Sequence, residues 1–79
     1  MDAEQLRAAR ALLRWSQQDL ADKCDVSVPT IKRLEAMDGE LSGHSNTLKT
    51  IEAALIAAGV QFIPENGGGA GVRLAKPRA

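Results

Sequence analysis

The sequence predicts a mainly α-helical chain in which four helices precede a short C-terminal β-hairpin. Apolar side chains recur three and four residues apart through most of residues 1–59, which is the period of a helix. After Gly59, two short apolar runs flank a glycine-rich stretch, a pattern typical of two strands joined by a loop. One Trp, one Phe and no Tyr leave Leu, Ile, Val and Ala to build the core. We therefore expect a helical domain over residues 1–59, with a hairpin and tail over residues 60–79.

The first helix is expected over residues 3–13. Asp2 is its N-cap, and Gln5 stands three residues later, at the spacing of a capping box. Arg10 lies at the edge of the apolar face, where a guanidinium needs a partner. Trp15 follows in the connection, where we expect it to cover the edge of the core. The apolar face itself carries Leu6, Ala9 and Leu13.

A second short helix is predicted to begin at Gln17. Ser16 caps it, and Asp19 completes the capping-box spacing. Asp25 then breaks the helical pattern, which indicates a turn. The inward side chains at helical spacing are Leu20, Ala21 and Cys24, of which the small Ala21 permits a close approach of another helix.

A third short helix follows immediately, so the two form a helix-turn-helix. Ser27 can cap it, and its first turn accepts Pro29, because the N–H that proline lacks has no intrahelical partner there. Its inward face carries Ile31, Leu34 and Glu35. The opposite, outward face carries Pro29, Thr30 and Arg33, with Val28 and Lys32 at its borders.

The fourth helix is expected over residues 47–58, with Gly59 as its stop signal. Ile56 falls off the face that the other apolar side chains share. The start of this helix is a natural phosphate site, because its first backbone N–H groups have no intrahelical partner. The residues at that start are His44, Ser45 and Asn46.

Two strands are predicted at residues 60–63 and 72–75, joined by the glycine-rich loop. An isolated two-stranded hairpin is only marginally stable in water, so it must pack on the helices or pair with another copy. We expect the second arrangement, a homodimer through residues 60–79. Its dimerisation residues would be Ile56, Val60, Phe62, Ile63, Val72 and Leu74.

The first three quarters of the chain resemble the XRE, or phage-repressor-like, helix-turn-helix family. The family pattern has an arginine, then S-Q-x-x-L-A, a turn and V-S-x-x-x-I-x-x-L-E. One position departs from it, because Asp25 replaces the usual turn glycine, and a left-handed backbone there costs about 1–2 kcal/mol, less for Asp than for most residues. The matching residues are Arg10, Ser16, Gln17, Leu20, Ala21, Val26, Ser27, Ile31, Leu34 and Glu35.

The resemblance implies a role for each matching position. Arg10 and Glu35 would form an ion pair between the first and third helices, and Gln17 would lie at the DNA backbone, near the base contacts. Lys32 suits a phosphate contact, because its ammonium group is a point charge. The residues implied at or near base edges are Ser27, Val28, Pro29, Thr30 and Arg33.

Composition excludes several other classes. Ten Lys and Arg balance ten Asp and Glu, so net charge gives no general attraction to nucleic acid. One His and one Cys are too few for a usual zinc site, and no nucleophile has an evident base, so we expect neither a metal or other cofactor nor an enzyme. Cys24 is expected to be a buried, inert thiol. Neither a signal peptide nor a membrane span is evident, which favours the cytoplasm.

The leading hypothesis is a sequence-specific double-stranded DNA-binding transcriptional regulator, a repressor that binds an inverted repeat as a homodimer. The third helix would enter the major groove. The main alternative is a protein-interaction module on the same scaffold, such as an antiactivator, which the zero net charge and the apolar Val28 and Pro29 would suit. A DNA-binding antitoxin is a third possibility. No small-molecule ligand is evident.

Overall fold

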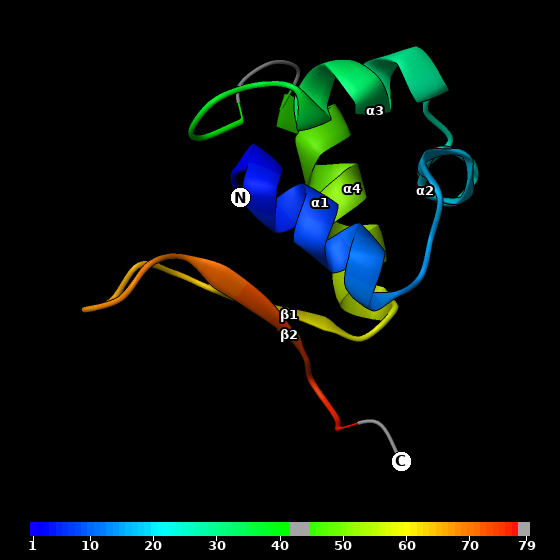
Figure 1. Ribbon diagram of the computed structural model, residues 1–79. Helices are drawn as coiled ribbons and strands as arrows, with labels where there is room; N and C mark the ends of the chain where they lie inside the picture. The colour runs from blue at the N-terminus through cyan, green and yellow to red at the C-terminus, as the bar shows by residue number, and fades with distance from the viewer. Residues whose placement is uncertain (42–44, 78–79) are drawn as a thin grey trace.

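The computed structural model describes residues 1–41 and 45–77. In that part of the chain, four helices precede a two-stranded antiparallel hairpin, which confirms the predicted fold class (Figure 1). None of the described helices is long and apolar enough to cross a membrane. The elements are α1 (Ala3–Leu12), α2 (Gln17–Cys24), α3 (Val28–Glu35), α4 (Ser45–Ala57), β1 (Val60–Ile63) and β2 (Gly71–Leu74).

Helix α1 is the central element of the fold. In Figure 1 it lies between α3 above and the hairpin below, and it contacts both. Its N-cap is Asp2, whose carboxylate accepts from Gln5 N at 2.7 Å while Asp2 N donates to Gln5 Oε1 at 3.0 Å, the predicted capping box. The buried apolar residues form one cluster: Ala3, Leu6, Ala9, Leu20, Ala21, Cys24, Ile31, Leu34, Leu41, Ile51, Leu55 and Val60.

The element boundaries differ from the predicted ones by one or two residues. Helix α1 ends at Leu12 because Leu13 is its C-cap, and α4 runs from Ser45 to Ala57 rather than over residues 47–58. Strand β2 begins at Gly71, one residue early, because Gly71 is still paired with Ile63. Such shifts are expected, because spacing patterns locate a face more sharply than an end.

The hairpin packs on the helices of its own chain. Val60 pairs with Leu74 and Phe62 with Val72, so these four side chains share the face of the sheet that lies toward α1 and α4. Val60 is only 2% exposed and belongs to the core, while Phe62 and Val72 pack against it. Val60 is therefore a core residue of its own chain, and its predicted contribution to a dimer interface stays a prediction.

Gln5 fastens the hairpin to the N-terminal end of α1. Its side-chain Nε2 donates to the carbonyl of Ile63 at 3.3 Å and to that of Gly71 at 3.0 Å. These two residues face each other at the loop end of β1 and β2, so one buried amide holds both strands. Because Gln5 also completes the N-terminal capping box, the same side chain closes the start of α1 and anchors the hairpin.

Candidate DNA-binding surface

Helix α2 is set in place by its caps and by three buried side chains. Ser16 Oγ accepts from Asp19 N at 3.0 Å, and Asp19 Oδ2 accepts from Ser16 N at 2.8 Å, so the capping box starts α2 at Gln17. Leu20, Ala21 and Cys24 are buried against the core. Burial raises the pKa of the Cys24 thiol, which keeps it protonated.

The turn between α2 and α3 passes through a left-handed residue. Asp25 has φ 54° and ψ 43°, so the position where the family usually has glycine does require a positive φ. Its N–H donates to the Ala21 carbonyl, and Val26 N donates to the same carbonyl at 3.1 Å. Both bonds close the C-terminus of α2, and the chain leaves it in the direction that starts α3.

Helix α3 presents a short polar face to solvent. Ser27 is its N-cap, and Ser27 Oγ lies 3.3 Å from Thr30 N and 2.8 Å from Thr30 Oγ1. Pro29, Lys32 and Arg33 are exposed, and the described residues give the charged ends of Lys32 and Arg33 no partner. Val28 is half-buried and packs against the core, so less of it faces outward than a border position suggests.

Glu35 lies at the buried end of α3 and joins three helices. Arg10 Nε and Nη2 donate to its two carboxylate oxygens at 2.8 and 3.0 Å, which makes the bidentate pair between α1 and α3. Gln17 Nε2 donates to Glu35 Oε1 at 3.1 Å from the first turn of α2. Arg10 Nη1 also donates to the Trp15 carbonyl at 2.9 Å. The network therefore fixes the relative positions of α1, α2 and α3.

The charges of this network keep Glu35 ionised. Burial favours the neutral acid and would raise its pKa, but hydrogen bonds from Arg10 and Gln17 and the charges of Arg10 and Arg7 lower it further than burial raises it. The net result is a pKa of Glu35 below its ordinary value. The Glu35 hydrogen bond likewise raises the pKa of Arg10.

Of the predicted phosphate-contacting residues at the start of α4, only part can be placed. Ser45 is the first residue of α4, and Asn46 is exposed in its first turn, where its carbonyl accepts from Thr50 Oγ1 at 2.8 Å. The prediction for His44 lies outside the described residues. Ser45 and Asn46 therefore remain candidates by their place at the helix start.

The sequence profile of the Helix-turn-helix family matches residues 6–45, half of the chain, and its matched segment contains α2, the turn and α3. The chain belongs to the XRE helix-turn-helix family. This is a family of DNA-binding transcription regulators. No curated protein matches the sequence.

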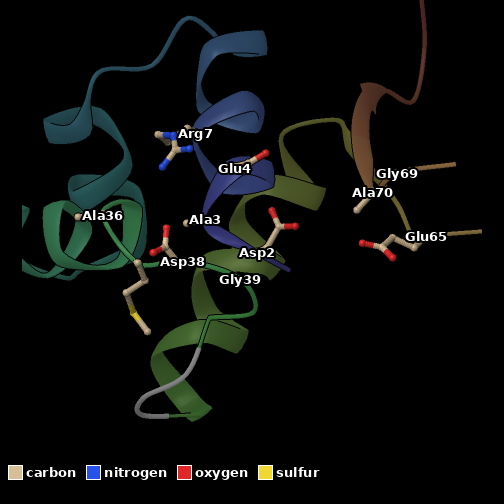
Figure 2. Close-up of a pocket in the computed structure, with 11 residues that line it drawn as sticks. Asp2, Ala3, Glu4, Arg7, Ala36, Asp38, Gly39, Glu65, Gly69 and Ala70 are labelled. Atoms are coloured by element: carbon tan, nitrogen blue, oxygen red, sulfur yellow. The ribbon is translucent and has the colours of Figure 1, made fainter.

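The XRE-family domain also has a polar cleft that is unsuited to a phosphate backbone. Figure 2 shows it between the N-terminal end of α1, the segment after α3 and the hairpin loop, with a volume of about 350 Å³. Asp2, Glu4, Asp38 and Glu65 line it, with Arg7 as its one cation. The excess of acids would repel phosphates, so this cleft is not where a DNA backbone would bind.

Two residues of the XRE-family domain have roles that our sequence reasoning missed. Arg7 Nη1 donates to the backbone carbonyl of Glu35, which satisfies a carbonyl at the C-terminus of α3. Arg7 stands one helical turn before Arg10 and therefore lies on the same face of α1. This spacing could have predicted that Arg7 also reaches α3. The bonds from Gln5 to the hairpin had no such signal, because nothing in a capping box reveals where the rest of the glutamine amide points.

Proposed function

We propose that the protein is a sequence-specific repressor that binds an inverted-repeat operator in double-stranded DNA as a homodimer. Helix α3 of each copy enters the major groove. The single observation that carries this proposal is the combination on α3 of unpaired outward cations, Lys32 and Arg33, with an inward carboxylate, Glu35, that is bonded from α1 and α2. A network of this kind holds the outer face rigidly, and base recognition needs rigidity.

Arg33 is the residue best suited to read a base. Its guanidinium can bond guanine O6 and N7 together, which a neighbouring lysine does less specifically. Lys32 contacts phosphate, and Pro29 contacts an apolar group such as a thymine methyl. Thr30 and Ser27 share a hydrogen bond at the start of α3, so either hydroxyl reaches DNA only with its remaining bonding capacity.

Gln17 supports binding from α2. One N–H of its amide is used by Glu35, which leaves the carbonyl oxygen and the second N–H for DNA. The outer face of α3 has few other hydrogen-bonding groups, so part of the specificity comes from the shape of the DNA. Val28 adds a limited apolar contact because it is half-buried.

The proposal is tested by selecting bound sequences from a random pool of duplex DNA with the full-length protein. We expect an enriched inverted repeat and a steep loss of affinity with added salt, because phosphate contacts release counterions. The Arg33→Ala and Lys32→Ala double variant is the matched control, since both side chains are exposed and their loss spares the fold. Failure of the wild type to enrich any sequence contradicts the proposal.

A second candidate is an antiactivator that uses the same scaffold to bind a protein. The zero net charge and the acidic cleft of Figure 2 favour it, since neither feature attracts DNA. The same selection separates the candidates, because a protein-binding module enriches no DNA site. The complex with its protein partner should then persist at high salt, because apolar contacts such as those of Pro29 would hold it together.

A further inference from the structure

The first turn of α3 presents carbon atoms, rather than charged groups, at the outer surface. Pro29 is exposed, and its ring offers neither a hydrogen-bond donor nor an acceptor. Val28 beside it is half-buried and equally apolar. The turn contains no acid, and the exposed cations Lys32 and Arg33 come one turn later. The beginning of α3 is therefore suited to an apolar contact.

The hydroxyl groups at this end of α3 are partly committed to each other. Ser27 Oγ accepts from Thr30 N at 3.3 Å and lies 2.8 Å from Thr30 Oγ1. Two hydroxyls that share a hydrogen bond keep only one free hydrogen between them. This pair has little capacity left to read the edge of a base, so the apolar surface of Pro29 carries much of the contact that the first turn can make.

Arg33 lies on the same face of α3 as Pro29. The two exposed residues are four positions apart, which makes them neighbours on a helix. Four residues advance about 6 Å along the helix axis, and successive base pairs are about 3.4 Å apart. In the major groove, the base that Pro29 contacts is therefore within about two base pairs of the guanine proposed for Arg33.

The apolar group that a base pair presents in the major groove is the C5-methyl group of thymine. Cytosine has only a hydrogen at C5, but 5-methylcytosine has the same methyl group at the same ring position. The N-terminal residues of a recognition helix are those that contact base edges. An apolar contact from Pro29 would therefore favour thymine over uracil and 5-methylcytosine over cytosine by the same physical effect, the burial of one methyl group.

We infer that Pro29 makes the protein a reader of the pyrimidine C5-methyl group, so that methylation of a cytosine close to the guanine read by Arg33 strengthens binding to DNA. This inference rests on the proposed function. It goes beyond it because affinity then depends on a covalent modification of the DNA as well as on its sequence. Burial of one methyl group corresponds to about a fourfold change in affinity.

The test uses duplexes of the sequence that the full-length protein enriches from a random pool. The guanine is located as the base whose preference is lost in Arg33→Ala. Each pyrimidine within about two base pairs of it is then supplied as thymine, uracil, cytosine or 5-methylcytosine, each opposite its pairing base. At one position, the wild type should bind thymine over uracil, and 5-methylcytosine over cytosine, about fourfold more tightly.

Variants of two exposed prolines show whether Pro29 is responsible. Pro29→Ala removes the ring carbons and leaves a good helix former, so both methyl preferences should vanish while the fold remains. Pro29→Ser gives the same expectation by an independent change that also suits a helix start. Pro64→Ala is the matched control, because Pro64 follows β1 in the hairpin, across α1 from α3 in Figure 1, and this variant should keep both preferences.

Two outcomes would overturn the inference alone. The wild type could bind the methylated and unmethylated bases equally at every position tested. A methyl preference could also persist in both Pro29 variants, which would mean that the methyl group acts through the shape of the DNA. In either case the protein still binds a specific sequence, so the proposed function stands. Failure to enrich any sequence would instead overturn the proposed function and this inference with it.

Discussion

Gln17 and Glu35 are joined by a hydrogen bond of 3.1 Å that links the first turn of α2 to the buried end of α3. Arg10 bonds both oxygens of the same carboxylate, so one buried acid receives its partners from two other helices. The position of Gln17 at the proposed DNA surface is therefore set from inside the protein. This arrangement makes Glu35 a residue whose changes should affect both stability and DNA binding.

The Arg10–Glu35 pair should show strong energetic coupling. In a double-mutant cycle with alanine at each position, we expect a coupling above the roughly 0.2–1 kcal/mol of exposed pairs, because either single change leaves the other charge near the core. Chemical denaturation of the four proteins measures it. Gln18 and Asp22, an exposed pair with a 2.8 Å bond, provide the matched control cycle. Additive effects of the Arg10 and Glu35 changes would contradict the expectation.

Acid should remove the stability that Glu35 contributes. The folded-state pKa of Glu35 lies below that of an unfolded glutamate, about 4.3, so its stabilisation is complete above that pH and is lost as the pH falls through the folded-state value. The free-energy difference between wild type and Glu35→Gln should therefore narrow on acidification below about pH 4.3. Urea unfolding at a series of pH values measures this, and a constant difference would count against it.

Two substitutions at Asp25, whose backbone is left-handed, should change the stability of the protein in opposite directions. Asp25→Gly should stabilise the protein by up to about 1 kcal/mol, because glycine adopts a positive φ without steric cost. Asp25→Val should destabilise it by at least about 1–2 kcal/mol, since a β-branched residue is strained there. Thermal unfolding of the wild type and the two variants gives their order of stability. A valine variant as stable as the wild type would mean that the turn relaxes.

Gln5 should contribute more to the free energy of unfolding than the exposed Gln18 does. Gln5→Ala leaves the carbonyls of Ile63 and Gly71 without their side-chain donor, so we expect a loss of about 1–3 kcal/mol in the free energy of unfolding. Gln18→Ala, at an exposed position, is the control and should change stability by less than about 0.5 kcal/mol. Equal effects of the two changes would show that the hairpin is held by its apolar face alone.

Arg33 should determine preference at one base pair of the operator. Arg33→Ala should lose about 1–3 kcal/mol of binding free energy and relax the choice at that position, whereas Lys32→Ala should weaken all sequences alike and reduce the salt dependence. Gln17→Ala should also weaken binding evenly. Competition binding with single-base variants of the selected site separates these patterns. An unchanged base preference in Arg33→Ala would mean that α3 is oriented differently.

The sequence predicted the helices well because their signals are local. The capping boxes at Asp2 and Ser16, the cap at Ser27 and the helical spacing of apolar residues each depend on neighbours within one or two turns. The left-handed turn at Asp25 was predictable from the family pattern. The inward face of α3 likewise placed Glu35 where Arg10 could reach it.

The parts that the sequence did not predict depend on contacts between distant segments. The alternation of apolar and polar residues along β1 could not show whether Val60 faces its own helices or a second copy. An apolar residue is expected at this position in either case. Gln17 looked free to contact DNA, and only the structure shows its bond to Glu35. The partial burial of Val28 was missed because it comes from packing against the core, which the helical spacing of α3 alone does not reveal.

The bonds from Gln5 to β1 and β2 also have a consequence for how the chain folds. They join residues 58 and 66 positions apart, so the first helix completes its packing only when the last strands are present. Closing such a large loop costs chain entropy before its contacts form, which places hairpin docking late in folding. During synthesis, the helix-turn-helix therefore emerges before the element that covers α1. A newly made chain reaches the full stability of this domain only once β2 has left the ribosome.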